Sequence, residues 1–319
     1  MKKALIIGID NYPNARLTGC VNDANAVGEL LKKNGDGSLN FDVSLNLNVE
    51  TKAECLELIE CLFSGDADVA LLYFSGHGSK YGHLITPDYK GKDLGVHMSE
   101  ILSYANKSKC KNKVIILDCC YSGKFGESII TQGNESILGE GVTIMTASSR
   151  EEVSEEKDGH GLFTSLFLQG LRGGAADIMG KITPAGIYSF IDQSLGAWQQ
   201  RPIFKTNISK FVSIRDIEPR VSKKTLRKLG KYFKCESDEF ELNPSFEFTN
   251  SIEYKHEVVQ PYAKKENVSI FKELQLFESV GLVEPVGEEH MYFAAMNSKS
   301  CKLTSLGVHY WKLSKDSRF

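Results

Sequence analysis

Three continuous apolar runs constrain the fold of this chain more than any other feature. They are DVALLYFSGHGS (68–79), NKVIILDCCYSG (112–123) and GVTIMTASS (141–149), and each stops at small or polar residues. The opening run KKALIIGID (2–10) is of the same kind. Strands that are apolar on both faces belong to the interior of a sheet covered on both sides. The runs therefore predict the central strands of an α/β fold.

Segments with other periods separate these runs. Residues 41–48 alternate as a half-buried strand does, and 201–214 form a last strand region. Four segments have helical periodicity, and one of them begins with Thr51 and Glu54 in capping-box spacing. The helical segments are 20–35, 51–65, 161–174 and 183–196. Strands that alternate with helices predict a mostly parallel sheet with helices on both faces.

The composition changes near residue 216. The run 220–234 carries seven Lys and Arg residues and no acid, and the following stretch, 235–257, is mostly acidic. An apolar stripe at 267–286 predicts a helix, 290–296 alternates weakly as a strand does, and 302–313 closes the segment. We therefore predict two domains, 1–215 and 216–319, the second a small α+β domain with a winged-helix-like arrangement.

Composition limits the function classes. The 319 residues carry a net charge of −3, and no run approaches the ~18 apolar residues of a membrane span. The first residues lack the pattern of a signal peptide, so a soluble cytoplasmic protein is expected. None of the eight cysteines forms a C-x₂-C pair, which argues against a zinc site and for reduced, mostly buried thiols.

Two polar clusters follow neighbouring strands of the predicted sheet. SGHGS contains His77 and DCCYSG contains Cys119 and Cys120, and both clusters come out at the carboxyl edge, where α/β sheets hold their sites. An imidazole beside a thiol ionises it and can later protonate a leaving amine, and a backbone N–H such as that of Gly78 can stabilise an oxyanion. A single histidine or cysteine at a strand end is usually structural. The joint pattern predicts a Cys/His dyad.

YFSGHGS (73–79) and ILDCCYSG (116–123) resemble the histidine and cysteine motifs of caspase-like cysteine peptidases, and are most similar to metacaspases and their prokaryotic relatives. Further landmarks are ALIIGIDNYP, LTGCVNDA, GVTIMTASS and GLFT, so the resemblance covers about 3–214. It implies a three-layer fold with a central, mostly parallel six-stranded sheet. It also implies that Cys120 is the nucleophile, His77 the base and acid, and the N–H groups of Gly78 and Cys120 the oxyanion hole. Cys119 stands where many members carry serine.

The resemblance also implies what the site would cut. Metacaspases cleave after Arg or Lys, and the positions that line their pocket correspond here to Asp23, Asp118, Ser75 and Cys20. A cationic side chain in a cleft needs carboxylate partners, which the two aspartates would supply. Asp23 has an alternative interpretation as a first-turn helix charge. Cleavage of proteins or peptides after Arg, and less readily after Lys, is the prediction.

No cofactor is expected. Many metacaspases bind calcium through an acidic cluster, but here only Asp88 and Asp93 are weak candidates. A calcium ion is usually coordinated by six to eight oxygens. The loop 122–142 holds one basic residue, Lys124, which favours activation by a partner or signal over cleavage within that loop.

Two other functions stay open at this point. One is an inactive caspase-like adaptor, although such proteins usually lose the histidine or the cysteine. The other is a nucleic-acid-binding regulator acting through 220–234, since phosphate contacts need only Lys and Arg. Pairing of those cations with the acidic stretch is favoured over nucleic acid. The second domain is expected to bind a regulatory protein, in a signalling or defence role that the resemblance implies only loosely.

Overall fold

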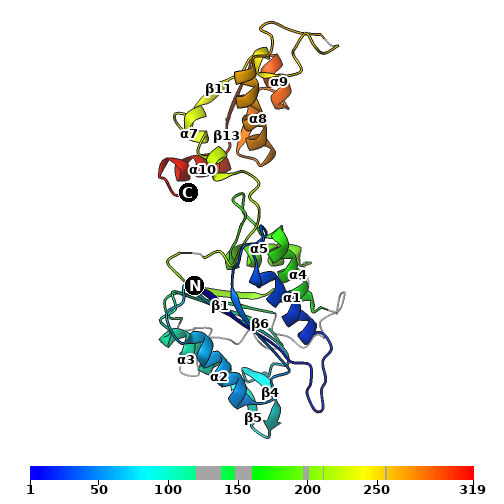
Figure 1. Ribbon diagram of the computed structural model, residues 1–319, viewed down its shortest axis with the longest axis vertical. Coiled ribbons are helices and arrows are strands. Elements are labelled where there is room, and N and C mark those ends of the chain that lie inside the picture. The colour runs from blue at the N-terminus through cyan, green and yellow to red at the C-terminus, as the bar shows by residue number, and fades with distance from the viewer. Residues whose placement is uncertain (120–137, 148–159, 197–200, 211, 256) are drawn as a thin grey trace. The chain divides into compact units, whose positions relative to one another are not determined.

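The computed structural model describes residues 1–119, 138–147, 160–196, 201–210, 212–255 and 257–319. The chain divides into two compact units, Met1–Glu218 and Pro219–Phe319 (Figure 1). Residues 216–218 lie with the first unit, because Asp216 pairs with Lys181 in a short antiparallel ladder. A division between 215 and 216 would therefore cut a strand.

A six-stranded sheet forms the centre of the first unit, in the order β2-β1-β3-β6-β7-β9. Its strands are β1 (Lys2–Gly8), β2 (Asp42–Leu47), β3 (Val69–Ser75), β6 (Asn112–Asp118), β7 (Val142–Thr146) and β9 (Ile203–Asn207). All neighbours pair in parallel except β9, which runs antiparallel to β7 at the edge. The predicted mostly parallel six-stranded sheet is confirmed.

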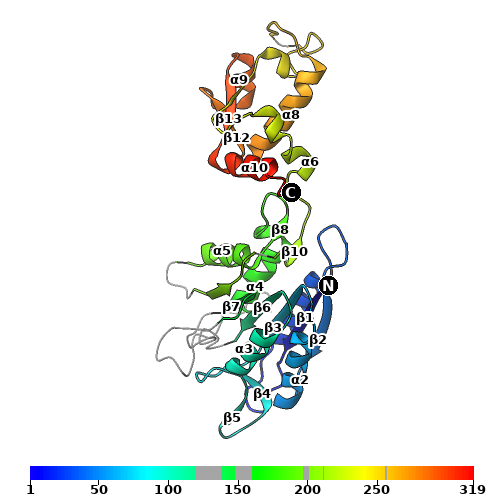
Figure 2. The ribbon, with the colours of Figure 1, turned by 90° about the vertical axis from the view of Figure 1, so that its left-hand side faces the viewer.

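Helices cover both faces of this sheet. They are α1 (Cys20–Lys32), α2 (Lys52–Phe63), α3 (Met98–Lys107), α4 (Leu162–Gln169) and α5 (Pro184–Ser194). Side chains of β3 alternate between two apolar clusters: Leu72 packs in one with α2 and α3, and Tyr73 in the other with α1, α4 and α5. Figure 1 shows α2 and α3 on one side of the sheet and α1, α4 and α5 on the other, and Figure 2 looks onto the side of α2 and α3. Among the described residues, no helix is long and apolar enough to cross a membrane.

Glycine 8 lets α1 approach the end of β1. A Cβ atom built at Gly8 would lie 2.4 Å from the Cys20 carbonyl oxygen and 2.6 Å from the Ala24 Cβ, so a larger residue would push the helix away. The close approach places the first turn of α1 against the carboxyl ends of the central strands. Asp23 lies in that turn.

Smaller elements complete the first unit. β4 (His83–Lys90) and β5 (Asp93–His97) form an antiparallel pair after the His77 loop, and β8 (Lys181–Ile182) pairs with β10 (Arg215–Asp216). The segment predicted as one helix at 161–174 continues beyond α4 as a π-helical turn, Gly170–Gly174. Thr51 caps α2 by accepting from the Glu54 N–H, as its spacing predicts.

The second unit is α+β, with a three-stranded antiparallel sheet ordered β11-β13-β12. Its elements are α6 (Lys223–Leu226), α7 (Leu229–Tyr232), β11 (Glu239–Glu241), a 3₁₀ turn (Pro244–Phe246), α8 (Lys265–Ser279), β12 (Val283–Val286), α9 (Met291–Met296), β13 (Ser300–Leu303) and α10 (Ser305–Lys315).

The strand prediction for 290–296 is wrong, because these residues form α9. Met291, Ala294 and Ala295 are buried, which is the i, i+3, i+4 spacing of a helix face and not the alternation of a strand. β12 and β13 are therefore joined through a helix rather than by the hairpin turn that a winged helix would have. In the basic run, Lys228 pairs with Glu273 of α8, which lies beyond the acidic stretch at 235–257.

Candidate active site

The predicted site residues of β3 and β6 lie at one edge of the central sheet. Ser75, the last residue of β3, is the register partner of Asp118, the last residue of β6. The Gly76 N–H donates to the Asp118 carbonyl at 3.3 Å, which holds the loop carrying His77 beside the end of β6. The two polar clusters therefore emerge side by side, as the parallel sheet predicts.

His77 is oriented by a backbone carbonyl. Its Nε2 lies 2.7 Å from the carbonyl oxygen of Ala15, in the segment between β1 and α1. A carbonyl oxygen can only accept, so Nε2 carries a hydrogen in this contact. The neutral ring then presents Nδ1 as an acceptor, which is the state required of a general base.

Tyr12 holds the His77 loop in place through its hydroxyl and its ring. Its hydroxyl accepts from the His77 N–H at 3.0 Å and donates to the Ile85 carbonyl at 3.1 Å, and its ring meets the imidazole edge-on with centroids 4.6 Å apart. Burial is the main factor that raises the pKa of Tyr12, so the phenol stays protonated and can donate. Sequence reasoning gave Tyr12 no role, although it lies in the landmark ALIIGIDNYP.

Replacing Tyr12 by Phe should lower activity by loosening His77. Because the hydrogen bonds of Tyr12 to the His77 N–H and to the Ile85 carbonyl of β4 are lost while the ring remains, we expect kcat to fall about 3- to 10-fold with KM unchanged. The measurement is steady-state kinetics on the Arg peptide that the resemblance implies as substrate, with Tyr104→Phe on α3 as the matched control. An unchanged kcat would show that the ring alone positions His77.

The backbone of Gly78 leaves its N–H available. Gly78 forms an isolated antiparallel bridge with Leu84, whose two hydrogen bonds are made by flanking residues: Ser79 N–H donates to His83 and His77 accepts from Ile85. In such a pair, the N–H of the central residue points away from the neighbouring strand. The Gly78 N–H is therefore directed outside the β4 ladder, as an oxyanion donor requires.

An acidic cluster, defined by Asp23, Ser75, Asp118 and Thr164, lies beside this loop. The Ser75 hydroxyl donates to Asp23 Oδ2 at 3.3 Å, and the Thr164 hydroxyl donates to Asp118 Oδ2 at 2.6 Å. Three elements, α1, β3 and β6, thus bring together the aspartates and the serine that the resemblance implies. Thr164, at the start of α4, was missed.

Asp23 is not the cap of α1. The N-cap position is Gly19, and the carboxylate of Asp10 accepts from the first-turn N–H groups of Cys20 and Val21 at 2.9 and 3.3 Å. The Asp23 side chain is directed instead to Ser75 and to His160. Asp23 does lie in the first turn of α1, as the alternative interpretation says, and its side chain also belongs to the acidic cluster.

Both carboxylates of the acidic cluster are destabilised as anions. Burial, and then the charge of Asp118, raise the pKa of Asp23 to about 6, against the opposing effect of His160. Burial likewise raises the pKa of Asp118 and of the nearby Cys20 thiol. Among the described residues, no Lys or Arg forms an ion pair with either aspartate. A cation entering here would relieve this repulsion.

His160 is a further residue that sequence reasoning missed. Its Nδ1 lies 2.6 Å from Asp23 Oδ1, although the two residues are 137 positions apart. The only sequence signal is its place directly before GLFT, which specifies the start of α4 and not a contact with α1.

Two of the predicted residues cannot be placed in this geometry, and a third packs elsewhere. Cys120, with its expected N–H in the oxyanion hole, and Lys124 lie outside the described residues. Cys119 is described and buried, in the apolar cluster that covers the α2 and α3 face. That placement agrees with a packing role for Cys119.

The calcium candidates lie away from the acidic cluster, near the start of α2. Asp88 accepts from the Lys52 N–H at 3.1 and 3.2 Å, and Asp93 lies 3.1 Å from the Lys52 ammonium. In the part of the chain that the structure describes, no three His, Cys, Asp or Glu side chains are grouped to hold a metal ion. The expectation that the protein needs no calcium stays an untested prediction.

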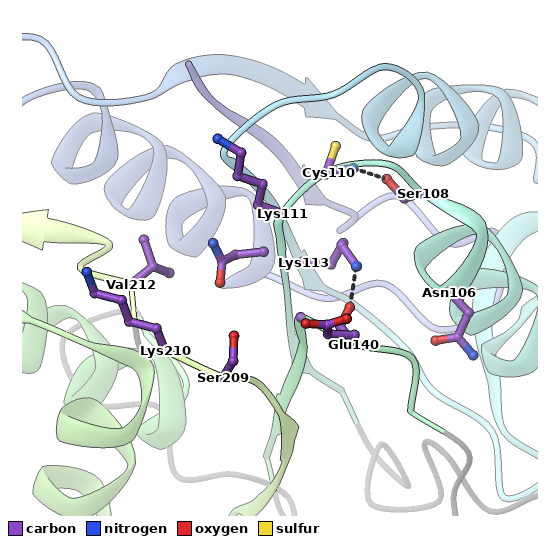
Figure 3. A pocket seen from close by; sticks show the side chains of 11 residues that line it. Asn106, Ser108, Cys110, Lys111, Lys113, Glu140, Ser209, Lys210 and Val212 are labelled. Carbon is purple, nitrogen blue, oxygen red and sulfur yellow. Dashed lines mark hydrogen bonds between the residues drawn. The ribbon is translucent and has the colours of Figure 1, made fainter.

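A separate hollow of about 750 Å³ lies at the other end of β6 (Figure 3). Lys113, the second residue of β6, lines it and donates to the Glu140 carbonyl at 2.6 Å, while Lys111, Ser209 and Lys210 form other parts of the wall. No predicted site residue lines this hollow, and four residues of strand separate Lys113 from Asp118.

Comparisons with known proteins agree with the fold. The crystal structure of caspase-1 from Spodoptera frugiperda is similar with a TM-score of 0.50 and 17% sequence identity, over 68% of this chain and 90% of that chain. At that identity the likeness shows the fold. No curated protein matches the sequence. The profile of the caspase domain, Peptidase_C14, matches residues 1–210, and the chain therefore belongs to the caspase-domain family of peptidases.

Proposed function

We propose that this protein is a cysteine endopeptidase that cuts polypeptides after Arg, and less readily after Lys, with Cys120 as nucleophile and His77 as base and acid. The acidic cluster supports the specificity most directly. It presents two carboxylates, both with raised pKa and neither paired with a Lys or Arg of the described residues. A guanidinium is planar and always charged, so it can donate hydrogen bonds to both carboxylates.

The position of this cluster supports its assignment to the residue before the cut. Ser75 lies two residues before His77, and Asp118 two residues before Cys120. A substrate side chain held between the ends of β3 and β6 would place its own carbonyl near both loops. Binding energy gained in the cluster would then align the scissile bond.

The dyad would act in two steps. Nδ1 of His77 takes the Cys120 thiol proton, the thiolate attacks the carbonyl carbon, and the oxyanion is received by the N–H groups of Gly78 and Cys120. The imidazolium then protonates the leaving amine, and the acyl enzyme forms. Water, deprotonated by His77, attacks the thioester, and the thiolate leaves and regains its proton. The Ala15 carbonyl holds Nε2–H through both steps and stabilises the imidazolium.

The affinity for basic substrates should fall in mild acid. Asp23 has a pKa of about 6, so it is charged above that pH and loses its charge as the pH falls through 6. We expect KM for an Arg peptide to rise about 10-fold for each pH unit below that value, because a neutral pocket acid no longer pairs with guanidinium. The check is KM between pH 5 and 8 for wild type and Asp23→Asn, since the variant should lack this step.

The function is tested with fluorogenic peptides that end in Arg, Lys or Asp, with and without calcium. Cleavage after Arg and Lys but not Asp is the expected result. Cleavage after Asp would contradict the assignment of the acidic cluster. If none of the three peptides is cleaved, and Cys120 also fails to react with iodoacetamide below pH 8, the inactive adaptor is favoured.

A further inference from the structure

The segment His160–Gly161 lies directly over the acidic cluster. The His160 imidazole contacts Asp23 at 2.6 Å, with side-chain exposures of 18% and 3% for the two residues. A Cβ atom built at Gly161 would lie 3.3 Å from Asp118 Oδ2 and 3.9 Å from Asp23 Oδ2. Both carboxylates are therefore within reach of one point beside this segment, and His160 faces the same place.

The groups around the Asp23 and Asp118 carboxylates are acids, a thiol and neutral donors. The Cys20 thiol lies near Asp10, Asp23 and Asp118, and the Tyr73 phenol lies near both carboxylates of the acidic cluster. The Asn22 amide lies 3.4 Å from the His160 ring. Within the described residues, His160 is the nitrogen base that contacts Asp23, and no Lys or Arg forms an ion pair with either aspartate.

We propose that His160 is a specificity-determining residue of the basic subsite, which holds the Asp23 carboxylate at the place where the substrate's basic side chain binds. As a neutral ring it donates Nδ1–H to Asp23 Oδ1 and holds that carboxylate without cancelling its charge. A permanent positive charge at position 160 would neutralise Asp23 and repel an incoming guanidinium. A cation at position 160 and the substrate's basic side chain therefore exclude each other. This inference rests on the proposed function.

A permanent cation at position 160 gives the sharpest test. The parent protein is Cys120→Ala, which cannot turn over, and the probe is a fluorescein-labelled tetrapeptide ending in Arg, measured by anisotropy at pH 8. Adding His160→Lys should weaken binding roughly 10- to 100-fold, since the lysine satisfies the carboxylates that the peptide needs. His160→Gln keeps a donor without charge and should bind within about 3-fold of the parent.

Gln169→Lys is the matched control, because it adds the same charge at an exposed position of α4. It should bind as the parent does. His160→Lys should also melt at or above the parent's temperature, because an ammonium beside two buried carboxylates stabilises them. A merely structural histidine would give the opposite pattern, with lower melting temperature and unchanged affinity.

The outcomes separate this inference from the proposed function. If the parent binds the Arg peptide and His160→Lys binds it equally, the inference is overturned while basic specificity stands. Weak binding by His160→Gln as well as His160→Lys would show that the imidazole itself is needed, and exclusion of the substrate by a charge at position 160 would be wrong. If the parent prefers a Glu-ending peptide over Arg, the proposed specificity and this inference both fail.

Discussion

Cys120→Ala should remove peptidase activity, with kcat/KM lower by at least about 10³-fold, because the proposed mechanism forms the acyl enzyme on this thiol. His77→Ala should cost a similar factor, since thiol ionisation and protonation of the leaving amine both depend on its Nδ1. The two losses should not add in the double variant, because the residues act as one unit. The measurement is hydrolysis of an Arg peptide by purified protein of each variant.

Cys119→Ala is the matched control for the nucleophile. Cys119 is 5% exposed and packs in the apolar cluster with the α2 and α3 side chains. Its loss should leave kcat/KM within about 3-fold and lower the free energy of unfolding by about 1 kcal/mol, as expected when one buried sulfur is removed. If Cys119→Ala is inactive and Cys120→Ala retains activity, the order of the two thiols has been assigned wrongly.

Asp23→Asn should lower the activity towards Arg peptides and raise the stability of the fold. The variant keeps an oxygen that can accept from Ser75 or His160 but cannot pair with a guanidinium. Losing one carboxylate of a desolvated pair costs about 2–4 kcal/mol, so kcat/KM for Arg peptides should fall about 30- to 1000-fold. Asp118→Asn should act in the same direction. Kinetics on Arg peptides beside an uncharged peptide would separate lost recognition from lost chemistry.

The same Asp23→Asn substitution should stabilise the fold at neutral pH. The pKa of Asp23 is raised from 3.8 to about 6, so ionisation is less favourable in the folded than in the unfolded chain. The loss of stability from ionising Asp23 in the folded chain is complete above pH 6 and vanishes below pH 3.8. Removing the carboxylate should therefore raise the free energy of unfolding by about 1–3 kcal/mol at pH 7. Thermal melts at pH 7 and pH 4 check this, since the gain should disappear at pH 4.

Asp93→Asn is the control for these effects. Asp93 is exposed on β5 and pairs with Lys52, far in the chain from the acidic cluster. It should change neither KM for Arg peptides nor the melting temperature appreciably, because exposed ion pairs contribute about 0–1 kcal/mol. If calcium activates the wild type but not Asp93→Asn, Asp93 is a calcium ligand and the expectation of no cofactor is wrong.

The arrangement of the central sheet could be predicted from the sequence. Strands apolar on both faces, such as 69–75 and 112–118, stabilise a sheet only when helices cover both sides, and the intervening segments carry the helical period. Parallel order then puts the ends of β3 and β6 together, which explains why Ser75 and Asp118 were predicted as neighbours.

The second unit was harder to predict, because its elements are short. The segment at 290–296 has apolar residues at spacings that fit either a strand or one helical turn, and only packing of Met291, Ala294 and Ala295 selects the helix. Over only six residues, the spacing of the apolar positions does not distinguish a strand from a helix.

The sequence by itself determined the strand ends, and with them the edge at which His77, Ser75 and Asp118 meet, because parallel register follows from the pattern of buried runs. Only the tertiary structure decided the orientation of the groups at that edge. Ala15 and Tyr12 contact His77 across 62 and 65 residues, and His160 contacts Asp23 across 137. Such contacts depend on how closely α1 and α4 pack against the sheet, through features such as Gly8 and Gly161. A hydrogen bond needs its two atoms placed to within a few tenths of an ångström, and sequence spacing carries no such information.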